Sequence, residues 1–339
     1  MIINAKKSDL PPVLEIDGHI LKQENKAKYV GDFFNKQGTN ADLIEDRIKK
    51  GKGKMISLLA LCEESGLGRY TVQSMILLYN RMFIPTLISN CQGWSHITKS
   101  NFISLERLQL KFLKLILWLP MSTPNAFIFL EYGILPLEHE IQRRRMNYVH
   151  HILSLKDNDP VKLTYHQMLK LSHEPNWANN VKELRLRYGI SFSDNEVSEM
   201  SVTKWKNIVS NHVEEVVFQE LLQQSKSLSK IRELEYEGFS CQSYLTTMDT
   251  FSIRKIARLR SRTFACKANQ KSANESNMLC RAGCAEVETQ DHLLNCQNIH
   301  GVVSDIDTTF VKNGDLYSYR RRLPELLRRM QVIEDWCVE

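Results

Sequence analysis

Three cysteines and one histidine near the C-terminal end of the sequence have the types and the spacing of a metal site. They are Cys280, Cys284, His292 and Cys296, in the pattern C-x3-C-x7-H-x3-C. Gly283 allows a tight turn between the first two thiols, and the i to i+4 spacing places the last two residues on one face of a short helix. Three thiolates and an imidazole form a closed tetrahedral set, typical of a structural zinc ion, Zn²⁺. The alternative is a group of buried thiols beside an unrelated surface histidine.

The residues around this cluster suit a bound cation. Three thiolates on Zn²⁺ leave about one net negative charge, which we expect Arg281 and the basic segment upstream to offset. Thr289 is placed to cap the short helix that carries the histidine. Cys266 and His300 lie near enough in the sequence to replace a ligand if one is assigned wrongly.

Two segments concentrate the positive charge of the chain. Between residues 250 and 274 there is no acidic residue, and Arg254, Arg258 and Arg262 recur every four residues, which predicts one face of a basic helix over 254–271. Basic side chains on one face favour contacts with a phosphate backbone, whereas a solvated helix face is the alternative. The candidate nucleic-acid contacts in the two segments are Lys49, Lys50, Lys52, Lys54, Arg254, Lys255, Arg258, Arg260, Arg262 and Lys267.

The first of these segments also contains two glycines inside a predicted helix. Gly51 and Gly53 alternate with lysines over 49–54. A glycine within a helix costs about 1 kcal/mol relative to alanine. The pair therefore indicates either that another backbone approaches closely there or that the helix has a weak, solvated middle.

The sequence has none of the patterns that support the common enzyme chemistries. It contains no Asp-Asp pair, no Walker loop, no GxGxxG motif and no GxSxG motif. His139, His150 and His151 lie on a predicted helix without a matching carboxylate and nucleophile, so we interpret them as polar-face histidines. We therefore predict that this chain is not an enzyme as it stands.

The composition is that of a folded globular protein. Of 339 residues, 42% are hydrophobic and 25% charged, and 45 Lys and Arg against 39 Asp and Glu give a net charge of +6. Eight cysteines are too few for a disulfide scaffold. The N-terminus lacks a signal-peptide pattern, and Lys114, Pro120, Pro124 and Glu131 interrupt the most apolar stretch. We expect an intracellular protein, nuclear or cytoplasmic, that is neither secreted nor membrane-bound.

Hydrophobic periodicity predicts a mainly α fold behind a small N-terminal β-meander. Strand signals flank Asp17–Gly18 and continue over 28–34, and helical spacing begins at Thr39. Pro85 is expected to end or kink a helix over 69–84, and Trp177 and Trp205 are expected to pack inward. Further helices are predicted over 100–119, 161–172, 176–188 and 201–224, and another begins after Pro136.

These elements predict a succession of regions along the chain. The strands are followed by a helical bundle, a helical connector, a basic helix with the zinc module, and a helical tail. The expected boundaries are 1–38, 39–156, 157–248, 249–300 and 301–339.

Three motifs carry a resemblance to a known family. Tyr29–Gly38 with Ile48–Lys54 is similar to the segment that follows the palm in non-LTR (LINE-type) retrotransposon reverse transcriptases, and Asn4–Ser8 resembles the end of that palm. Leu78–Trp94 resembles the thumb of these enzymes. The Cys280–Cys296 cluster resembles their C-terminal CCHC zinc knuckle, with three residues rather than four between the histidine and the last cysteine.

The resemblance implies a part of a polymerase that holds nucleic acid. The family's RNA-directed DNA polymerase uses paired aspartates of the palm to hold two metal ions, and this sequence has no such pair. We expect the palm and fingers upstream in a parent protein, residues 39–119 as the thumb, and 250–296 as a tail that grips RNA or DNA. The resemblance thus implies a non-catalytic C-terminal fragment that binds the template–primer duplex.

Two alternatives stay open at this point. The chain could be a zinc-containing helical scaffold that binds a protein partner and no nucleic acid. It could also be an enzyme that works together with a separately encoded palm.

Overall fold

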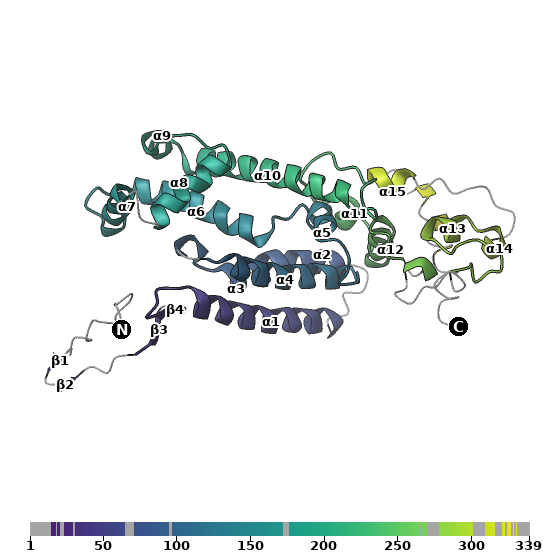
Figure 1. Ribbon diagram of the computed structural model, residues 1–339, viewed down its shortest axis with the longest axis horizontal. Coiled ribbons are helices and arrows are strands. Elements are labelled where there is room, and N and C mark those ends of the chain that lie inside the picture. Colours follow the sequence, from purple (N-terminus) through teal and green to yellow (C-terminus); the bar gives the residue numbers. More distant parts are fainter. Residues whose placement is uncertain are drawn as a thin grey trace. The chain divides into compact units, whose positions relative to one another are not determined.

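The computed structural model describes most of the chain. The described residues are 15–17, 19–20, 24–29, 31–64, 71–94, 97–171, 176–264, 266–269, 278–300, 309–315 and several positions between 321 and 330. As predicted, they form a mainly α structure with short strands near the N-terminus (Figure 1). The 4–8 motif and most of the predicted tail over 301–339 lie outside the described residues.

The chain forms two compact units, each assembled from separate segments. Unit 1 contains residues 1–58, 79–109 and 135–216, and unit 2 contains 59–78, 110–134 and 217–339. The division falls inside three long helices, which are α1 (Ala41–Glu64), α4 (Lys99–Ile116) and α10 (Val202–Ser227). The units therefore do not coincide with the consecutive regions expected from the sequence.

The strands of unit 1 form two hairpins. β1 (Glu15–Ile16) pairs with β2 (His19–Ile20), and β3 (Lys26–Tyr29) pairs with β4 (Asp32–Asn35), both antiparallel. The two pairs belong to separate two-stranded sheets, so the prediction of a three-stranded meander is wrong. The predicted strand over 28–34 folds back on itself because Gly31 adopts a φ of 90°, which glycine reaches without strain.

Helix α6 (Leu137–Ser154) is the packing centre of unit 1. It contacts the 3₁₀ turn η3 (Cys91–Gly93) and the helices that follow it in the chain. Those helices are α7 (Pro160–Lys170), α8 (Trp177–Arg187) and α9 (Asp194–Glu199). Their bounds lie close to the predicted ones, except that α9 was not predicted, and Trp177 and Trp205 are buried as expected.

Two of the three histidines of α6 are buried. His139 Nδ1 lies 2.8 Å from the Tyr188 hydroxyl, and His150 Nε2 lies 2.8 Å from the Met200 carbonyl oxygen. The interpretation as polar-face histidines is wrong for these two, because α6 is covered by neighbours on more than one side. His151 is exposed and stacks on Tyr148.

The helix expected to end or kink at Pro85 changes its hydrogen-bonding pattern just before the proline. α2 (Thr71–Leu78) leads into a π-helical turn, η2 (Tyr79–Phe83), and then into α3 (Ile84–Ile88), in which Pro85 occupies the first turn. Proline lacks an N–H and clashes with the carbonyl of the preceding turn. A wider π-turn immediately before the proline accommodates both effects.

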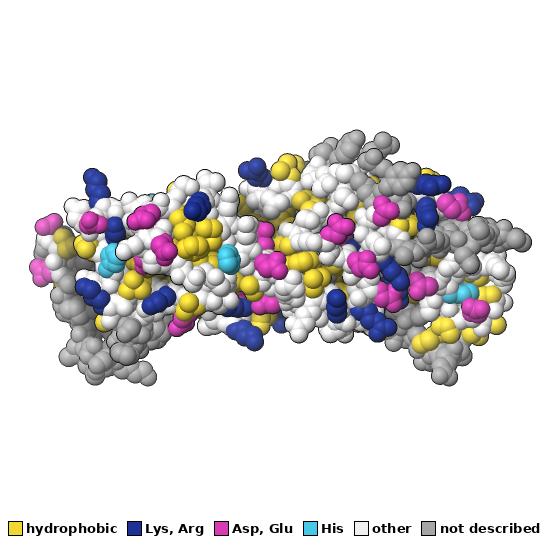
Figure 2. Space-filling model, turned by 90° about the horizontal axis from the view of Figure 1, so that it is seen from above, with side chains coloured by type: hydrophobic (Ala, Val, Ile, Leu, Met, Phe, Trp, Pro, Cys, Tyr) yellow, Lys and Arg dark blue, Asp and Glu magenta, His cyan; other side chains and the backbone are white. Residues whose placement is uncertain are grey.

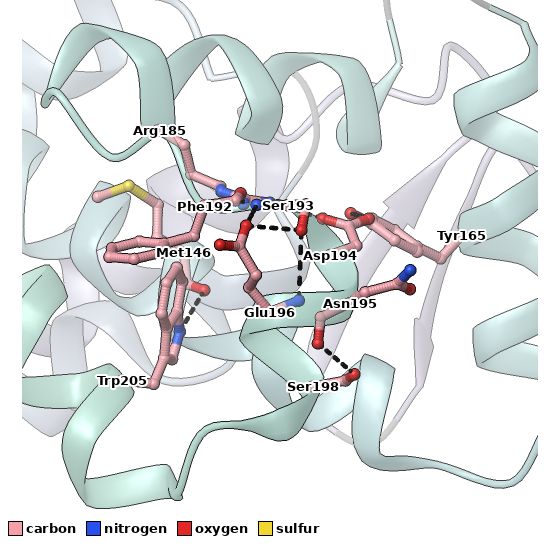
Figure 3. A network of polar contacts seen from close by, with 10 residues as sticks. All are labelled: Met146, Tyr165, Arg185, Phe192, Ser193, Asp194, Asn195, Glu196, Ser198 and Trp205. Carbon is pink, nitrogen blue, oxygen red and sulfur yellow. Dashed lines mark hydrogen bonds and ion pairs between the residues drawn. The ribbon is translucent and has the colours of Figure 1, made fainter.

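A polar network joins α7, α8 and the start of α9 with the loop before it (Figure 3). Arg185 Nη1 lies 2.7 Å from Asp194 Oδ1, and the other terminal nitrogen donates to the Phe192 carbonyl. Tyr165 donates to Asp194 Oδ2 at 3.0 Å. Next to it, Ser193 and Glu196 form a reciprocal capping box at the start of α9. The network holds the loop over 188–193 in place, and it pairs the buried guanidinium of Arg185 with two acceptors.

Unit 2 is built around α5 (Asn125–Tyr132) and α12 (Thr250–Arg260). α5 is buried almost throughout and was not predicted, because a segment that is apolar on all sides has no helical periodicity. α12 packs against α2 and α15 (Thr309–Asn313), and α11 (Tyr244–Thr247) also packs against α2. Further helical elements of unit 2 are the 3₁₀ turn η4 (Lys267–Asn269), α13 (Gln290–Asn295) and α14 (Gln297–His300).

Hydropathy separates these helices from membrane spans. Across the described parts of the chain, no helix reaches both the length and the apolar content that crossing a bilayer requires.

Candidate metal centre and basic surfaces

A small hairpin and a short helix bring the predicted ligands together. Cys280 N donates to the Glu286 carbonyl at 2.7 Å, and Leu279 pairs with Val287 across the hairpin. Gly283 takes a φ of 76° inside the turn. Thr289 accepts a hydrogen bond from His292 N at 3.1 Å, which confirms the predicted cap of α13.

The four ligand atoms lie within 4.8 Å of one another, so the cluster could hold a metal ion. Cys296 Sγ lies 3.8 Å from Cys280 Sγ and 3.7 Å from Cys284 Sγ. A tetrahedral zinc ion with bonds of about 2.3 Å separates two sulfur ligands by about 3.8 Å. His292 Nε2 lies 3.1 Å from Cys284 Sγ. The donor set and its spacing therefore fit a four-coordinate site.

Glu286 orients the histidine of the cluster. Its carboxylate lies 3.1 Å from His292 Nδ1, on the side opposite the sulfurs. A carboxylate in this place fixes the imidazole tautomer that presents Nε2 as a ligand. This contact was not predicted, although a glutamate in the loop between the second and third ligands is a signal for it in the sequence.

The thiols of the cluster have different acidities. Burial raises the pKa of Cys280 to about 12, whereas a backbone hydrogen bond at Glu286 lowers the pKa of Cys284 below its usual value. Thiolates rather than thiols bind metal ions. Metal binding must therefore displace a proton from the buried thiol.

Arg281, which was expected to offset the charge of the cluster, is paired with a glutamate. Its guanidinium pairs with the buried carboxylate of Glu288, which also accepts from Lys267 N at 2.9 Å. Gln290 Nε2 donates to the Leu259 carbonyl at the end of α12, at 3.0 Å. These bonds attach the metal hairpin to the rest of unit 2. Cys266 is buried but does not belong to the ligand group, and the burial of His300 is not described.

The predicted basic helix over 254–271 is shorter than expected. α12 ends at Arg260, and Arg262 follows in a turn with a φ of 49°, so it cannot continue the face of Arg254 and Arg258. Arg262 instead lies 3.2 Å from Glu233 and 3.7 Å from Asp291. Lys267, on η4, donates to the Leu279 carbonyl at 2.8 Å. Tertiary contacts therefore direct these two residues away from a common helix face.

Two of the predicted nucleic-acid contacts are buried. Arg260 is 1% exposed and pairs with Glu131, and Lys255 is 3% exposed beside the ring of Phe251. Neither side chain is accessible to a phosphate, so the prediction is wrong for both residues. Arg254 is half-buried and Arg258 is partly exposed.

The lysines of α1 lie in unit 1 and differ in their partners. Lys50 lies 2.6 Å from Asp46, whereas Lys49 and Lys52 are exposed and Lys54 is half-buried. No acidic partner within the described residues pairs with Lys49, Lys52 or Lys54. Within unit 1, α1 therefore presents unneutralised positive charge to solvent.

The two glycines of α1 lie in different surroundings. A Cβ on Gly51 would lie 2.4 Å from Leu87 Cδ2 and 3.0 Å from Leu108 Cδ2, so this glycine allows close packing of helices inside unit 1. A Cβ on Gly53 would meet nothing within 4 Å. Of the pair, Gly53 is the one that leaves the solvent face of α1 open to an approaching backbone.

Comparisons of the chain with known protein families, with curated proteins and with solved structures find no match.

Proposed function

We propose that this chain binds nucleic acid through the solvent face of α1 and that a zinc ion holds its C-terminal hairpin folded. The observation that carries the proposal is the set of unpaired lysines beside Gly53. Lys52 and Gly53 follow Lys49 by three and four residues, so these three residues share one side of the helix. Backbone phosphates suit such a surface because they carry regularly spaced negative charge.

The missing side chain of Gly53 supports a close approach. Lysines that flank a glycine can place their ammonium groups on either side of a backbone that lies against the helix. Contacts of this kind provide affinity and position, and they do not read base sequence. We therefore propose that binding depends weakly on sequence and strongly on salt.

The unpaired lysines of α1 differ from the mixed charges that Figure 2 shows on one face of the molecule. On that face, Lys and Arg side chains lie interspersed with Asp and Glu side chains. On a surface of mixed charge, the carboxylates repel a polyanion next to the basic side chains that attract it, so the net attraction is small. The unpaired lysines of α1 are therefore better suited to a phosphate backbone than a surface of mixed charge.

We also propose that the chain is the template–primer-holding part of a non-LTR retrotransposon reverse transcriptase. The support is the resemblance of the 29–54, 78–94 and 280–296 motifs. RNA and DNA duplexes are both suitable ligands for the lysine face. We assign no catalytic step to this chain, because its residues provide no aspartate pair for metal-assisted phosphoryl transfer.

The role proposed for zinc is structural. Cys280, Cys284, His292 and Cys296 would fill all four tetrahedral positions, which leaves none for water or substrate. The ion supplies cross-links in place of a hydrophobic core, for which the hairpin is too small. Within the hairpin and its helix, only a few side chains such as Leu293 and Leu294 are buried.

A charge-matched comparison tests the nucleic-acid proposal. Substitution of Lys49, Lys52 and Lys54 by alanine should weaken duplex binding and reduce the slope of log K against log salt by about 2 to 3. The control replaces Lys182, Lys204 and Lys206, which are exposed lysines of the same unit, by alanine. Fluorescence anisotropy at several salt concentrations measures both.

The proposal fails if both triple variants lose the same affinity, or if the wild-type chain binds neither RNA nor DNA at low salt. The latter result would favour the helical scaffold that binds a protein partner.

A further inference from the structure

An exposed tryptophan in unit 2 occupies an unusual position. Trp118 follows the end of α4 and is 61% exposed, although its neighbours Leu117 and Leu119 are 0% and 4% exposed. The two buried leucines hold the chain in place, and the residue between them must point outward. Its φ is 54°, in the left-handed region that bulky side chains rarely adopt.

The indole ring is covered on one side by an arginine of α12. The guanidinium carbon of Arg254 lies 3.7 Å from the centre of the Trp118 ring, which is van der Waals contact with its face. Arg254 Nε donates to the Ile116 carbonyl at the end of α4, at 3.1 Å. This bond holds the guanidinium on the ring. Given the large exposed fraction of Trp118, the opposite face remains open to solvent.

α12 brings no negative charge to the pair. α12 contains no acidic residue between Thr250 and Arg260. Burial first, and the nearby charge of Arg258 in addition, lower the pKa of Arg254 to about 10, so its guanidinium stays protonated at neutral pH. Apart from the Ile116 carbonyl, Arg254 has no hydrogen-bond acceptor or acidic partner in the part of the chain that the structure describes.

A second exposed aromatic ring lies on the same side of α12. Phe251 is half-exposed and precedes Arg254 by three residues, so the two side chains are neighbours on the helix surface. Two exposed aromatic residues therefore lie near Arg254, Trp118 by contact and Phe251 by helical spacing.

We propose that Trp118 and Arg254 form a stacking platform for an unpaired base of single-stranded nucleic acid. This inference rests on the nucleic-acid binding proposed above and adds a second, single-strand-specific contact. A base stacks on the open face of the indole, while the remaining N–H groups of Arg254 reach the adjoining phosphate. The indole face suits a planar ring, and the guanidinium suits an anion beside that ring. A nucleotide provides both, as its base and its phosphate.

The platform discriminates between strand forms. Bases in a duplex are already stacked and paired, so they have no free face for Trp118. Unpaired bases offer that face whatever their identity. The platform thus selects single strands without selecting a sequence.

The test uses two substitutions at one position in the full chain. Trp118→Gly removes the ring and places at a φ of 54° the residue that adopts this conformation without strain, so the fold is retained. Trp118→Phe keeps an aromatic face. Each variant is titrated with a single-stranded oligothymidylate and with a duplex of equal length, and urea unfolding verifies that each is folded.

We expect Trp118→Gly to lose about 5-fold or more in affinity for the single strand, with duplex affinity unchanged within about 2-fold. Trp118→Phe should retain most of the single-strand affinity. Oligothymidylate should quench the tryptophan fluorescence of the wild-type chain, and Trp118→Gly should lose this quenching.

Unchanged single-strand affinity in Trp118→Gly overturns the platform, as does an equal loss for both strand forms. A wild-type chain that binds duplex but no single strand overturns the platform and leaves the proposed function intact. A chain that binds neither overturns both.

Discussion

Arg260 and Glu131 form a fully buried ion pair in unit 2. Arg260 Nη2 lies 2.8 Å from Glu131 Oε1, and both side chains are 0% exposed. The carboxylate also accepts hydrogen bonds from the hydroxyls of Tyr236 and Tyr244, at 2.8 and 2.5 Å. Arg260 donates in addition to the Lys312 carbonyl of α15. One buried arginine thus joins α5, α12 and α15.

Removal of this arginine should strongly destabilise the protein. Arg260→Met leaves the Glu131 carboxylate buried without its cation, and the free energy of unfolding should fall by about 3–5 kcal/mol. Arg262→Met, the control, breaks partly exposed pairs and should cost less than about 1 kcal/mol. Urea denaturation compares the two, and equal losses would show that the Arg260–Glu131 pair does not support unit 2.

Alanine at the two glycines of α1 should have opposite effects. Gly51→Ala forces a methyl group against Leu87 and Leu108, and we expect a loss of about 1–3 kcal/mol from overpacking. Gly53→Ala meets open space and should stabilise the helix by about 1 kcal/mol. Thermal unfolding of both variants measures the difference. Stabilisation by Gly51→Ala would contradict the packing described for unit 1.

Stability should decrease in mild acid because of His139. Burial, and then the charge of Arg187, lower the pKa of His139 from 6.5 to about 4. Above pH 6.5 the histidine is neutral in both states. Between pH 6.5 and about 4 the unfolded chain binds a proton that the folded chain does not, so stability falls, by about 3 kcal/mol in total.

The pH effect is checked by urea unfolding at pH 7.5 and pH 4.5. His139→Gln should reduce the loss of stability over this range, because glutamine does not titrate. His166→Gln changes an exposed histidine and should leave the loss unchanged. A pH dependence that persists in His139→Gln would assign the effect to another group.

Loss of one ligand should remove the zinc ion and loosen the hairpin. Cys284→Ser is expected to lower the zinc content well below about one ion per chain and to increase hydrogen exchange across residues 278–296. Cys266→Ala, at a buried thiol outside the cluster, should keep the ion. Elemental analysis and hydrogen exchange provide the readouts. Zinc retained by Cys284→Ser, or lost by Cys266→Ala, would contradict the ligand set.

Local features of the chain were predictable from the sequence. The metal ligands lie within 17 residues, counted from Cys280 to Cys296, so a single turn and a short helix are enough to bring them together. The helices α7, α8 and α10 follow hydrophobic periodicity, and Gly189 ends α8 at a φ of 69°. In each case the determining interactions join residues that are a few positions apart.

Only the tertiary structure decided which basic residues are accessible. Arg258 and Arg260 stand two positions apart in a segment without acidic residues, yet Arg260 is buried because its partner Glu131 lies 129 residues away. Gly51 and Gly53 also differ in their surroundings. Gly51 lies on the side of α1 that packs against Leu87, and Gly53 lies on the side that faces solvent. Spacing along the chain determines which side chains share a helix face. What covers that face depends on segments distant in the sequence, because burial results from packing between elements and not from periodicity within one.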